Sequence, residues 1–431
     1  MAPEAGAINE HFPVRTSQVA AVCVCQILAL AGYSAVPALL PQFVSIWSLN
    51  NTQAGWLAGA FFAGYMAAVL PLVALTDRIA PRRIYLVAAA LNVAYYFAFA
   101  SVGSWLFALI VQLLGGIALA DLYMPGLRSI VPAGGGTELA NGQGPGKTRA
   151  EGGGRARTVA WYTSSFTLGA SLSFLFAGRI AELVGWRSAF VGAGLCAVAA
   201  LAIAAVAMPT GAASSAGAPT RLMDLPAVLR NRQAMAFMIG YVAVIWSASG
   251  LRNWIVLLLG SAVGGRAAVP AGSWIPLSTA TLVNLLGVPA ALLGNEIAIS
   301  FGLRRTAAGA FILAAVTAGL FGFAAALPPV VLCGLALVAA VILQLNFANL
   351  TAGLLATAEP ARAGLTMAFY SFVGFAGSFL GPLVFGWMLD RFGGAHSLLA
   401  WGFAYGSCGL AALVGGLAVL LIGRDRTTRP A

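Results

Sequence analysis

Long apolar runs alternate with short polar joints along almost the whole chain. Each run has about the ~20 residues that an α-helix needs to cross a ~30 Å hydrocarbon core. The pattern therefore predicts twelve membrane-spanning helices. They cover approximately residues 17–46, 54–76, 84–103, 105–131, 158–183, 188–208, 234–260, 273–300, 306–326, 329–357, 364–388 and 396–422.

The joint between the second and third runs indicates the orientation of the chain. It contains Asp77, Arg78, Arg82 and Arg83, and so many charges are tolerated only in water or among lipid headgroups. Arginine-rich joints favour the cytoplasmic side. If this joint is cytoplasmic, all 23 lysines and arginines fall on that side except five that lie opposite or inside spans. These five are Arg179, Arg187, Arg252, Arg266 and Arg391. The bias predicts an even number of spans with both termini in the cytoplasm.

Composition agrees with this pattern. Of 431 residues, 60% are hydrophobic and only 8% are charged, whereas a soluble protein carries about a quarter charged residues. The net charge is +11, but the basic residues lie singly or in small clusters between apolar runs, so no nucleic-acid partner is expected. The five cysteines lie inside apolar runs, the two histidines lie apart, and no phosphate-binding loop is present. We therefore expect no metal site and no cofactor.

Two polar segments divide the chain. Residues 133–157 are rich in glycine and predict a flexible cytoplasmic loop. Residues 209–233 predict a central cytoplasmic loop between the sixth and seventh spans. The expected fold is an all-α membrane protein with twelve transmembrane helices in two six-helix halves. Its parts are a cytoplasmic tail at 1–16, a bundle at 17–208, the loop at 209–233, a bundle at 234–422 and a cytoplasmic tail at 423–431.

Two patterns occur once in each half. The fifth and eleventh spans share the spacing Gly-x3-acid-x2-Gly, formed by Gly178, Glu182 and Gly185 and by Gly386, Asp390 and Gly393. The loops after the second and eighth spans both end in two arginines, Arg82-Arg83 and Arg304-Arg305. Matches at corresponding places indicate duplicated halves, as in many secondary transporters.

This layout resembles the major facilitator superfamily over nearly the whole chain. In that family the loop after the second span follows Gly-x3-Asp-Arg-x-Gly-x-Arg-Arg. This sequence keeps Asp77, Arg78, Arg82 and Arg83 but has Val73 and Ala80 at the glycine positions. The resemblance implies that these charges, with Arg304 and Arg305 in the second half, make gating contacts between the halves.

A looser resemblance concerns the kind of carrier. The segments 123–128 and 252–254 are similar to bacterial carriers grouped with the nitrate/nitrite and cyanate permeases. The family's arginine in the fourth span is replaced by Gln112, and the Gly-Pro of many antiporters is Gly169-Ala170 here. Both departures argue against a drug/proton antiporter.

Two charges lie deep inside spans, where a charge costs a few kcal/mol. At a rise of ~1.5 Å per residue, Asp121 lies ~4.5 Å from the middle of the fourth span, and Arg252 lies ~7.5 Å from the middle of the seventh. The resemblance implies that spans one, four, seven and ten line a central cavity. We interpret Arg252 as an anion-binding group and Asp121 as a proton carrier. The alternative is that each bonds to a local hydroxyl or amide and has no functional role.

Polar side chains on the other two cavity spans are further candidates for substrate contact. Gln26 and Tyr33 are seven residues apart on the first span and share a face. The tenth span carries Gln344, Asn346 and Asn349. The alternative for all five is hydrogen bonding between helices, worth under ~1 kcal/mol per contact in membranes.

The sequence therefore predicts a monomeric secondary transporter, not an enzyme, in the lipid bilayer of the bacterial inner membrane. Its cargo is interpreted as a small organic or inorganic anion moved by alternating access, and Asp121 suggests protons as the coupling ion. The first alternative is an exporter of neutral or cationic compounds. An alternative of another class is a non-transporting membrane sensor, but both polar loops are too short for a folded output domain.

Overall fold

The computed structural model describes residues 16–76, 79–130, 149–208, 224–269, 273–359 and 362–421, apart from the side chains of 72–76, 121, 128, 149–156 and 363. In these ranges the regular structure is helical. The first half contains α1 (Thr16–Ala29), α2 (Ala35–Ile46), α3 (Asn51–Thr76), α4 (Pro81–Ala100), α5 (Trp105–Ile130), α7 (Arg149–Val184) and α8 (Trp186–Ala207). The second half contains α9 (Leu225–Arg230), α10 (Arg232–Gly260), α11 (Ile275–Leu285), α12 (Gly287–Phe301), α13 (Leu303–Phe321), η2 (Gly322–Ala326), α14 (Pro329–Gln344), α15 (Phe347–Thr357), α16 (Ala363–Arg391) and α17 (Leu398–Leu421).

The predicted fold class is confirmed. In the described part of the chain, eleven helical segments are long and apolar enough to cross a membrane. The two shorter apolar helices α1 and α2 follow one another where the sequence predicts the first span. Together they give the expected order of twelve spans.

Two of the spans are interrupted next to a proline. Pro37 has no N–H to bond the carbonyl of Tyr33, so α2 starts as a new helix at Ala35 and Tyr33 lies in the turn. In the eighth span, Pro289 likewise cannot bond the carbonyl of Leu285, where α11 ends. Interrupted helices of this kind often occur at transporter binding sites.

The tenth span is interrupted without a proline. α14 ends at Gln344 and α15 begins at Phe347. The Asn346 side chain lies at the joint and donates to the carbonyl of Ala307 in α13. A side-chain contact with a neighbouring helix therefore accompanies this break.

Two segments predicted as loops are partly helical. α7 begins at Arg149, so residues 149–157 of the predicted loop 133–157 are helical, and 133–148 lies outside the described residues. Extending a helix is inexpensive once the span has nucleated it, because each added residue gains a backbone hydrogen bond. The predicted loop 209–233 contains α9, and α10 begins at Arg232. The side chain of Asn231 caps α10 by accepting the N–H of Ala234, which explains this earlier start.

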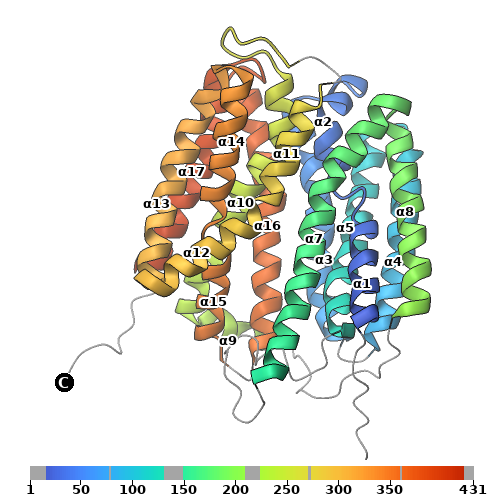
Figure 1. Cartoon of the computed structure of the whole chain (residues 1–431). Helices are drawn as coiled ribbons and strands as arrows, with labels where there is room; N and C mark the ends of the chain where they lie inside the picture. The colour runs from blue at the N-terminus through green and yellow to red at the C-terminus, as the bar shows by residue number, and fades with distance from the viewer. Residues whose placement is uncertain are drawn as a thin grey trace, which may run out of the picture.

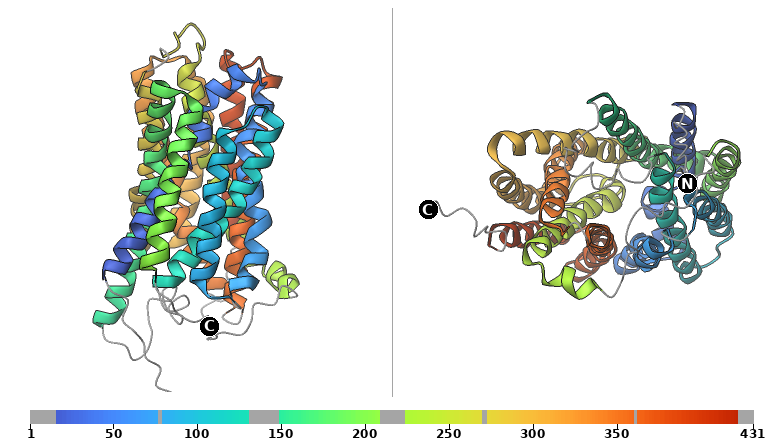
Figure 2. Two further views of the ribbon diagram at one scale, coloured as in Figure 1. Left: turned by 90° about the vertical axis from the view of Figure 1, so that its right-hand side faces the viewer. Right: turned by 90° about the horizontal axis from the view of Figure 1, so that it is seen from below.

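The helices form two groups side by side. Seen along the bundle, α1–α8 lie in one group and α9–α17 in the other (Figure 2). The arginine-rich end is the end of the bundle that carries Arg82, Arg83, Arg304 and Arg305, at the bottom of Figure 1. The opposite end carries the start of α3 and the end of α16.

The halves meet mainly through three helix pairs, α3 with α16, α7 with α11, and α2 with α10. Glycines allow the closest approach of α3 and α16. A Cβ at Gly386 would lie 2.1 Å from the carbonyl oxygen of Asn51, and a Cβ at Gly55 would lie 2.4 Å from that of Pro382. Larger residues at these positions would force the backbones apart.

Candidate functional site

Arg252 of α10 reaches across the interface between the halves. Its guanidinium carbon lies 4.8 Å from the ring centre of Tyr33 and 5.2 Å from that of Phe62, both in the first half. The side chain is half-buried. Among the described residues it has no ion pair and no hydrogen bond. The two predicted site residues Arg252 and Tyr33 are therefore in contact, and the cation is held by aromatic rings.

The ring of Tyr33 is fixed by other aromatic side chains of the first half. It meets Phe61 and Phe166 edge to face, each at 5.8 Å between ring centres. Phe166 in turn meets Tyr123 of α5 at 5.3 Å. A continuous row of rings thus leads from Arg252 to the part of α5 that carries Asp121.

Asp121 lies within α5, as predicted, two residues before Tyr123. Its side chain lies outside the described residues. Its role as a proton carrier stays a prediction.

Gln26 is fully buried inside the first half. Its Oε1 accepts a 2.7 Å hydrogen bond from the hydroxyl of Tyr162, which also contacts the carbonyl oxygen of Tyr123 at 3.1 Å. The amide thus connects α1 to α7 and α5. Its Nε2 has no partner in the described chain, so substrate contact by Gln26 stays a prediction.

The polar residues of the tenth span connect helices of the second half. Gln344 donates to the carbonyl of Ala340 in its own helix. Asn349 donates to the carbonyl of Gly294 in α12 at 3.1 Å, and Asn346 binds α13 as described above. The Oδ1 atoms of both asparagines have no partner among the described residues. Their amide groups take part in helix packing, and substrate contact stays a prediction.

The arginines of the proposed gate have contacts within their own halves. Arg82, at the start of α4, donates to the carbonyl of Ala205 near the end of α8. Arg304, at the start of α13, donates to the carbonyl of Leu420 near the end of α17. Arg83 and Arg305 are exposed. Asp77 and Arg78 lie outside the described residues, so a gating contact between the halves stays a prediction.

Asp390 is an interface residue that sequence reasoning did not select as a site. Its Oδ1 accepts the backbone N–H and side-chain amide of Asn51 at 3.0 and 2.7 Å. Its Oδ2 accepts the N–H and hydroxyl of Thr52 at 2.7 and 2.6 Å. A carboxylate of α16 therefore caps the first turn of α3 across the interface. The signal was the repeated Gly-x3-acid spacing, which suggested duplication but no partner.

A second aromatic group lies in the second half. Tyr241 of α10 stacks on Tyr370 of α16 with ring centres 3.9 Å apart, and Phe347 of α15 meets Tyr241 at 5.5 Å. The hydroxyl of Tyr370 lies 2.9 Å from that of Thr351. Aromatic side chains from spans seven, ten and eleven thus come together, as those of spans one, four and five do in the first half.

Comparisons with known proteins agree with this architecture. Residues 22–283 match the family model of the Major Facilitator Superfamily. The solved structure of a bacterial homologue of the human lysosomal transporter Spinster, inward-facing and occupied, superposes with a TM-score of 0.69 at 16% identity, covering 96% of this chain and 97% of that chain. The nucleoside transporter NupG superposes with a TM-score of 0.65 at 13% identity, covering 95% of this chain and 100% of that chain. No curated protein matches the sequence.

The long apolar helices of the described residues define an integral membrane protein, and the match to a transporter family indicates a transporter rather than an enzyme. The match to the family model covers more than half of the chain. The protein belongs to the Major Facilitator Superfamily, and the resemblance found in the sequence is confirmed.

Proposed function

We propose that this protein carries a small organic or inorganic anion across the membrane by alternating access, with Arg252 as the anion-binding group. The observation that carries the proposal is the guanidinium of Arg252 between the halves, in contact with Tyr33 and Phe62. A site between the halves is reached from each side of the membrane in turn as the halves rock.

The physical argument concerns the donors of the guanidinium. A charge at this depth costs a few kcal/mol, and contact with aromatic faces returns about 0.5–2 kcal/mol. Aromatic rings contact the flat face of a guanidinium and leave its in-plane N–H groups available. These groups form a fork that matches a carboxylate or an oxyanion. An anionic cargo would supply both the missing charge and the missing acceptors.

The proposal includes an orientation and a coupling ion. We propose that the arginine-rich end faces the cytoplasm, because basic residues favour the cytoplasmic ends of membrane spans. The contacts of Asp390 with Asn51 and Thr52 would then hold the external side closed. Asp121 is proposed to carry the coupled proton, because it is an acidic residue within a membrane span, α5.

The test measures uptake by purified protein in liposomes. A thermal-shift screen of small carboxylates and oxyanions first selects the anion, because a ligand that binds the folded protein raises its melting temperature. Removing a charge-assisted hydrogen bond costs about 1.5–3 kcal/mol, so we expect Arg252→Gln to lower uptake by roughly 10-fold to 100-fold. Uptake by Arg252→Lys should fall between that of the wild type and that of Arg252→Gln, since lysine keeps the charge but lacks the planar fork. Asp121→Asn should abolish uptake driven by a pH gradient and keep anion exchange.

Arg187 offers a matched control. Its guanidinium carbon lies 4.3 Å from the ring centre of Trp186, but both residues belong to the first half. We expect Arg187→Gln to leave uptake within about twofold of the wild type. Unchanged uptake and an unchanged anion-induced shift in Arg252→Gln would remove the basis of the proposal. Loss of exchange in Asp121→Asn, with Arg252→Gln active, would favour a cationic or neutral cargo.

A further inference from the structure

A groove of about 410 Å³ lies between α12 and α13 near the arginine-rich end. Gly294, Ile297 and Phe301 of α12 form one wall, and Gly309 and Leu313 of α13 belong to the other. The volume is in the range of small-molecule sites. None of the proposed substrate-binding residues lines the groove, and it shares only Arg305 with the proposed gate.

Two glycines shape the groove, Gly294 by close backbone packing and Gly309 by leaving space. Gly294 packs so closely that a Cβ there would lie 1.8 Å from the carbonyl oxygen of Leu345, which fixes α12 against the joint of α14 and α15. Gly309 has no side chain to fill the space, and a Cβ added there would meet nothing within 4 Å. The groove therefore does not depend on one rotamer of a flexible residue.

The groove opens on the outer side of the second half. α13 forms the edge of the bundle, with α12 in front of it (Figure 1). Phe301 is 68% exposed and Leu313 is 45% exposed. In a membrane, exposed apolar side chains at this position contact lipid tails, so the groove is open to acyl chains.

Two polar side chains lie at the edge of the groove. Arg305 is exposed and lines the groove. Thr306 also lines it, is only 9% exposed, and its Oγ1 has no hydrogen-bond partner among the described residues. Both lie in the first turn of α13, which begins at Leu303, and the backbone N–H groups of a first turn favour an anion. A cation and a buried hydroxyl, both without a partner among the described residues, thus lie beside a helix N-terminus at the edge of an apolar groove.

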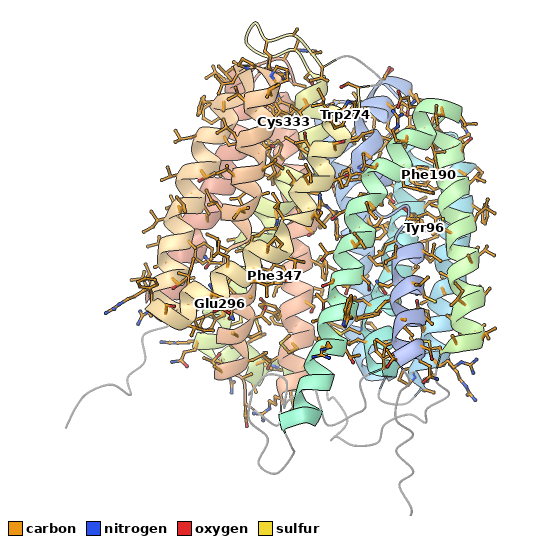
Figure 3. The ribbon with its side chains drawn as sticks, in the orientation of Figure 1. Tyr96, Phe190, Trp274, Glu296, Cys333 and Phe347 are labelled. Atoms are coloured by element: carbon orange, nitrogen blue, oxygen red, sulfur yellow. The ribbon has the colours of Figure 1, made fainter. Side chains whose placement is uncertain are left out.

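We propose that this groove binds an anionic phospholipid from the leaflet at the arginine-rich end. One acyl chain lies between α12 and α13, and the phosphate accepts hydrogen bonds from Arg305 beside the first turn of α13. Basic pockets between membrane helices bind anionic headgroups in this way. Glu296, on α12 near the same end (Figure 3), is exposed and does not line the groove.

The experiment counts lipids retained by the purified, delipidated full-length protein in native mass spectrometry. The probes are phosphatidylglycerol, phosphatidylcholine and inorganic phosphate. We expect one phosphatidylglycerol to be retained in preference to phosphatidylcholine. Gly309→Leu fills the groove and should abolish this retention, and so should Leu313→Trp, which fills it from the exposed side. Arg305→Gln should lower the preference for phosphatidylglycerol about fivefold, because a fivefold difference is the usual effect of one basic side chain on binding to an anionic membrane surface.

Matched controls separate the groove from general effects. Gly319 lies on the same helix outside the groove, and a Cβ there also meets nothing within 4 Å, so Gly319→Leu should keep the lipid. Arg230 is an exposed cation at the same end, and Arg230→Gln should keep the preference. Equal retention in Gly309→Leu, Leu313→Trp and the wild type would overturn the proposal. Displacement of the lipid by inorganic phosphate would overturn it too, since it would indicate a simple ion site.

Discussion

At the scale of single residues, Arg266 has the largest set of hydrogen bonds among the described side chains. It is 7% exposed and lies in the turn after α10, where Gly264 and Gly265 have positive φ angles of 55° and 86°. Its Nη2 donates to the carbonyls of Leu258 and Ser261, and its Nε donates to that of Ala325 in η2, each at 2.8 Å. The guanidinium thus satisfies carbonyls at the end of α10, and burial lowers its pKa.

We expect Arg266→Met to lower the free energy of unfolding by about 3 kcal/mol, because several buried carbonyl groups lose their donor. Arg266→Lys should lower it by less, since an ammonium keeps the charge but cannot reach as many carbonyls. Thermal melting of the purified protein measures both. Arg391→Met removes an exposed arginine at the same end and is the control. If both methionine variants melt alike, Arg266 does not stabilise the fold through these bonds.

The sequence could show that Arg252 lies inside a span, but not which side chains it contacts. Counting residues places it ~7.5 Å from the middle of the seventh span. Its contacts Tyr33 and Phe62 come from the other half, and Tyr33 lies in the turn where the first span is interrupted. The sequence likewise gave no indication that Asn346 and Asn349 bind α13 and α12.

At the scale of helices, the number and order of spans follow from apolar length, but the interruptions do not follow from proline alone. α2, α3, α5 and α16 each contain an internal proline and remain continuous. The breaks occur before Pro37 and Pro289, and at Asn346 without a proline. Whether a helix continues depends on which neighbouring groups bond the freed carbonyls, and that depends on the tertiary packing.

The cap that Asp390 provides for α3 gives a prediction at this scale. Asp390→Ala removes four hydrogen bonds between the halves. A hydrogen bond to a charged group stabilises a contact by up to about 1.5–3 kcal/mol. We expect the opposite end to open more often. Spin labels at Val184, the last residue of α7, and Trp274, just before α11, should show a longer mean distance in this variant, since both are exposed. The labels are attached to introduced cysteines, so the five native cysteines are first replaced.

Glu182 is the natural control, because it occupies the equivalent position in the repeated pattern. Its ion pair is with Arg179 in the same helix, where the two side chains are 35% and 51% exposed. Such pairs contribute about 0–1 kcal/mol, so Glu182→Ala should leave the distance unchanged. A lengthening as large as that of Asp390→Ala would show that loss of an acid at this end is sufficient, and that the cap on α3 has no special role.

At the scale of the whole molecule, the two halves repeat one contact. Arg82 and Arg304 stand at the same place in the repeated loops, and each binds a carbonyl near the end of the last helix of its half. The sequence could predict this equivalence from the paired arginines. It could not predict the acceptor, because a backbone carbonyl leaves no mark in the sequence. The shared contact supports the duplication of the halves.

The close approach of α3 and α16 gives the last prediction. Because a Cβ at Gly386 would lie 2.1 Å from the carbonyl oxygen of Asn51, Gly386→Val cannot keep the halves together at the opposite end. Alternating access requires that end to close and open in turn. We therefore expect Gly386→Val to lose transport by at least about tenfold, since the blocked closure costs more than 1.4 kcal/mol. The distance between labels at Val184 and Trp274 should lengthen while ligand-induced thermal shifts remain.

Gly406→Val tests whether a valine in a membrane helix is harmful in itself. Gly406 lies in α17, and a Cβ there meets nothing within 4 Å, so this variant should transport at the wild-type rate. Loss of thermal shifts together with transport in Gly386→Val would indicate misfolding, which the melting temperature reveals independently. A folded Gly386→Val protein with normal transport would show that α3 and α16 need not touch during the cycle. The halves would then close mainly through α7 with α11 and α2 with α10, which also connect them.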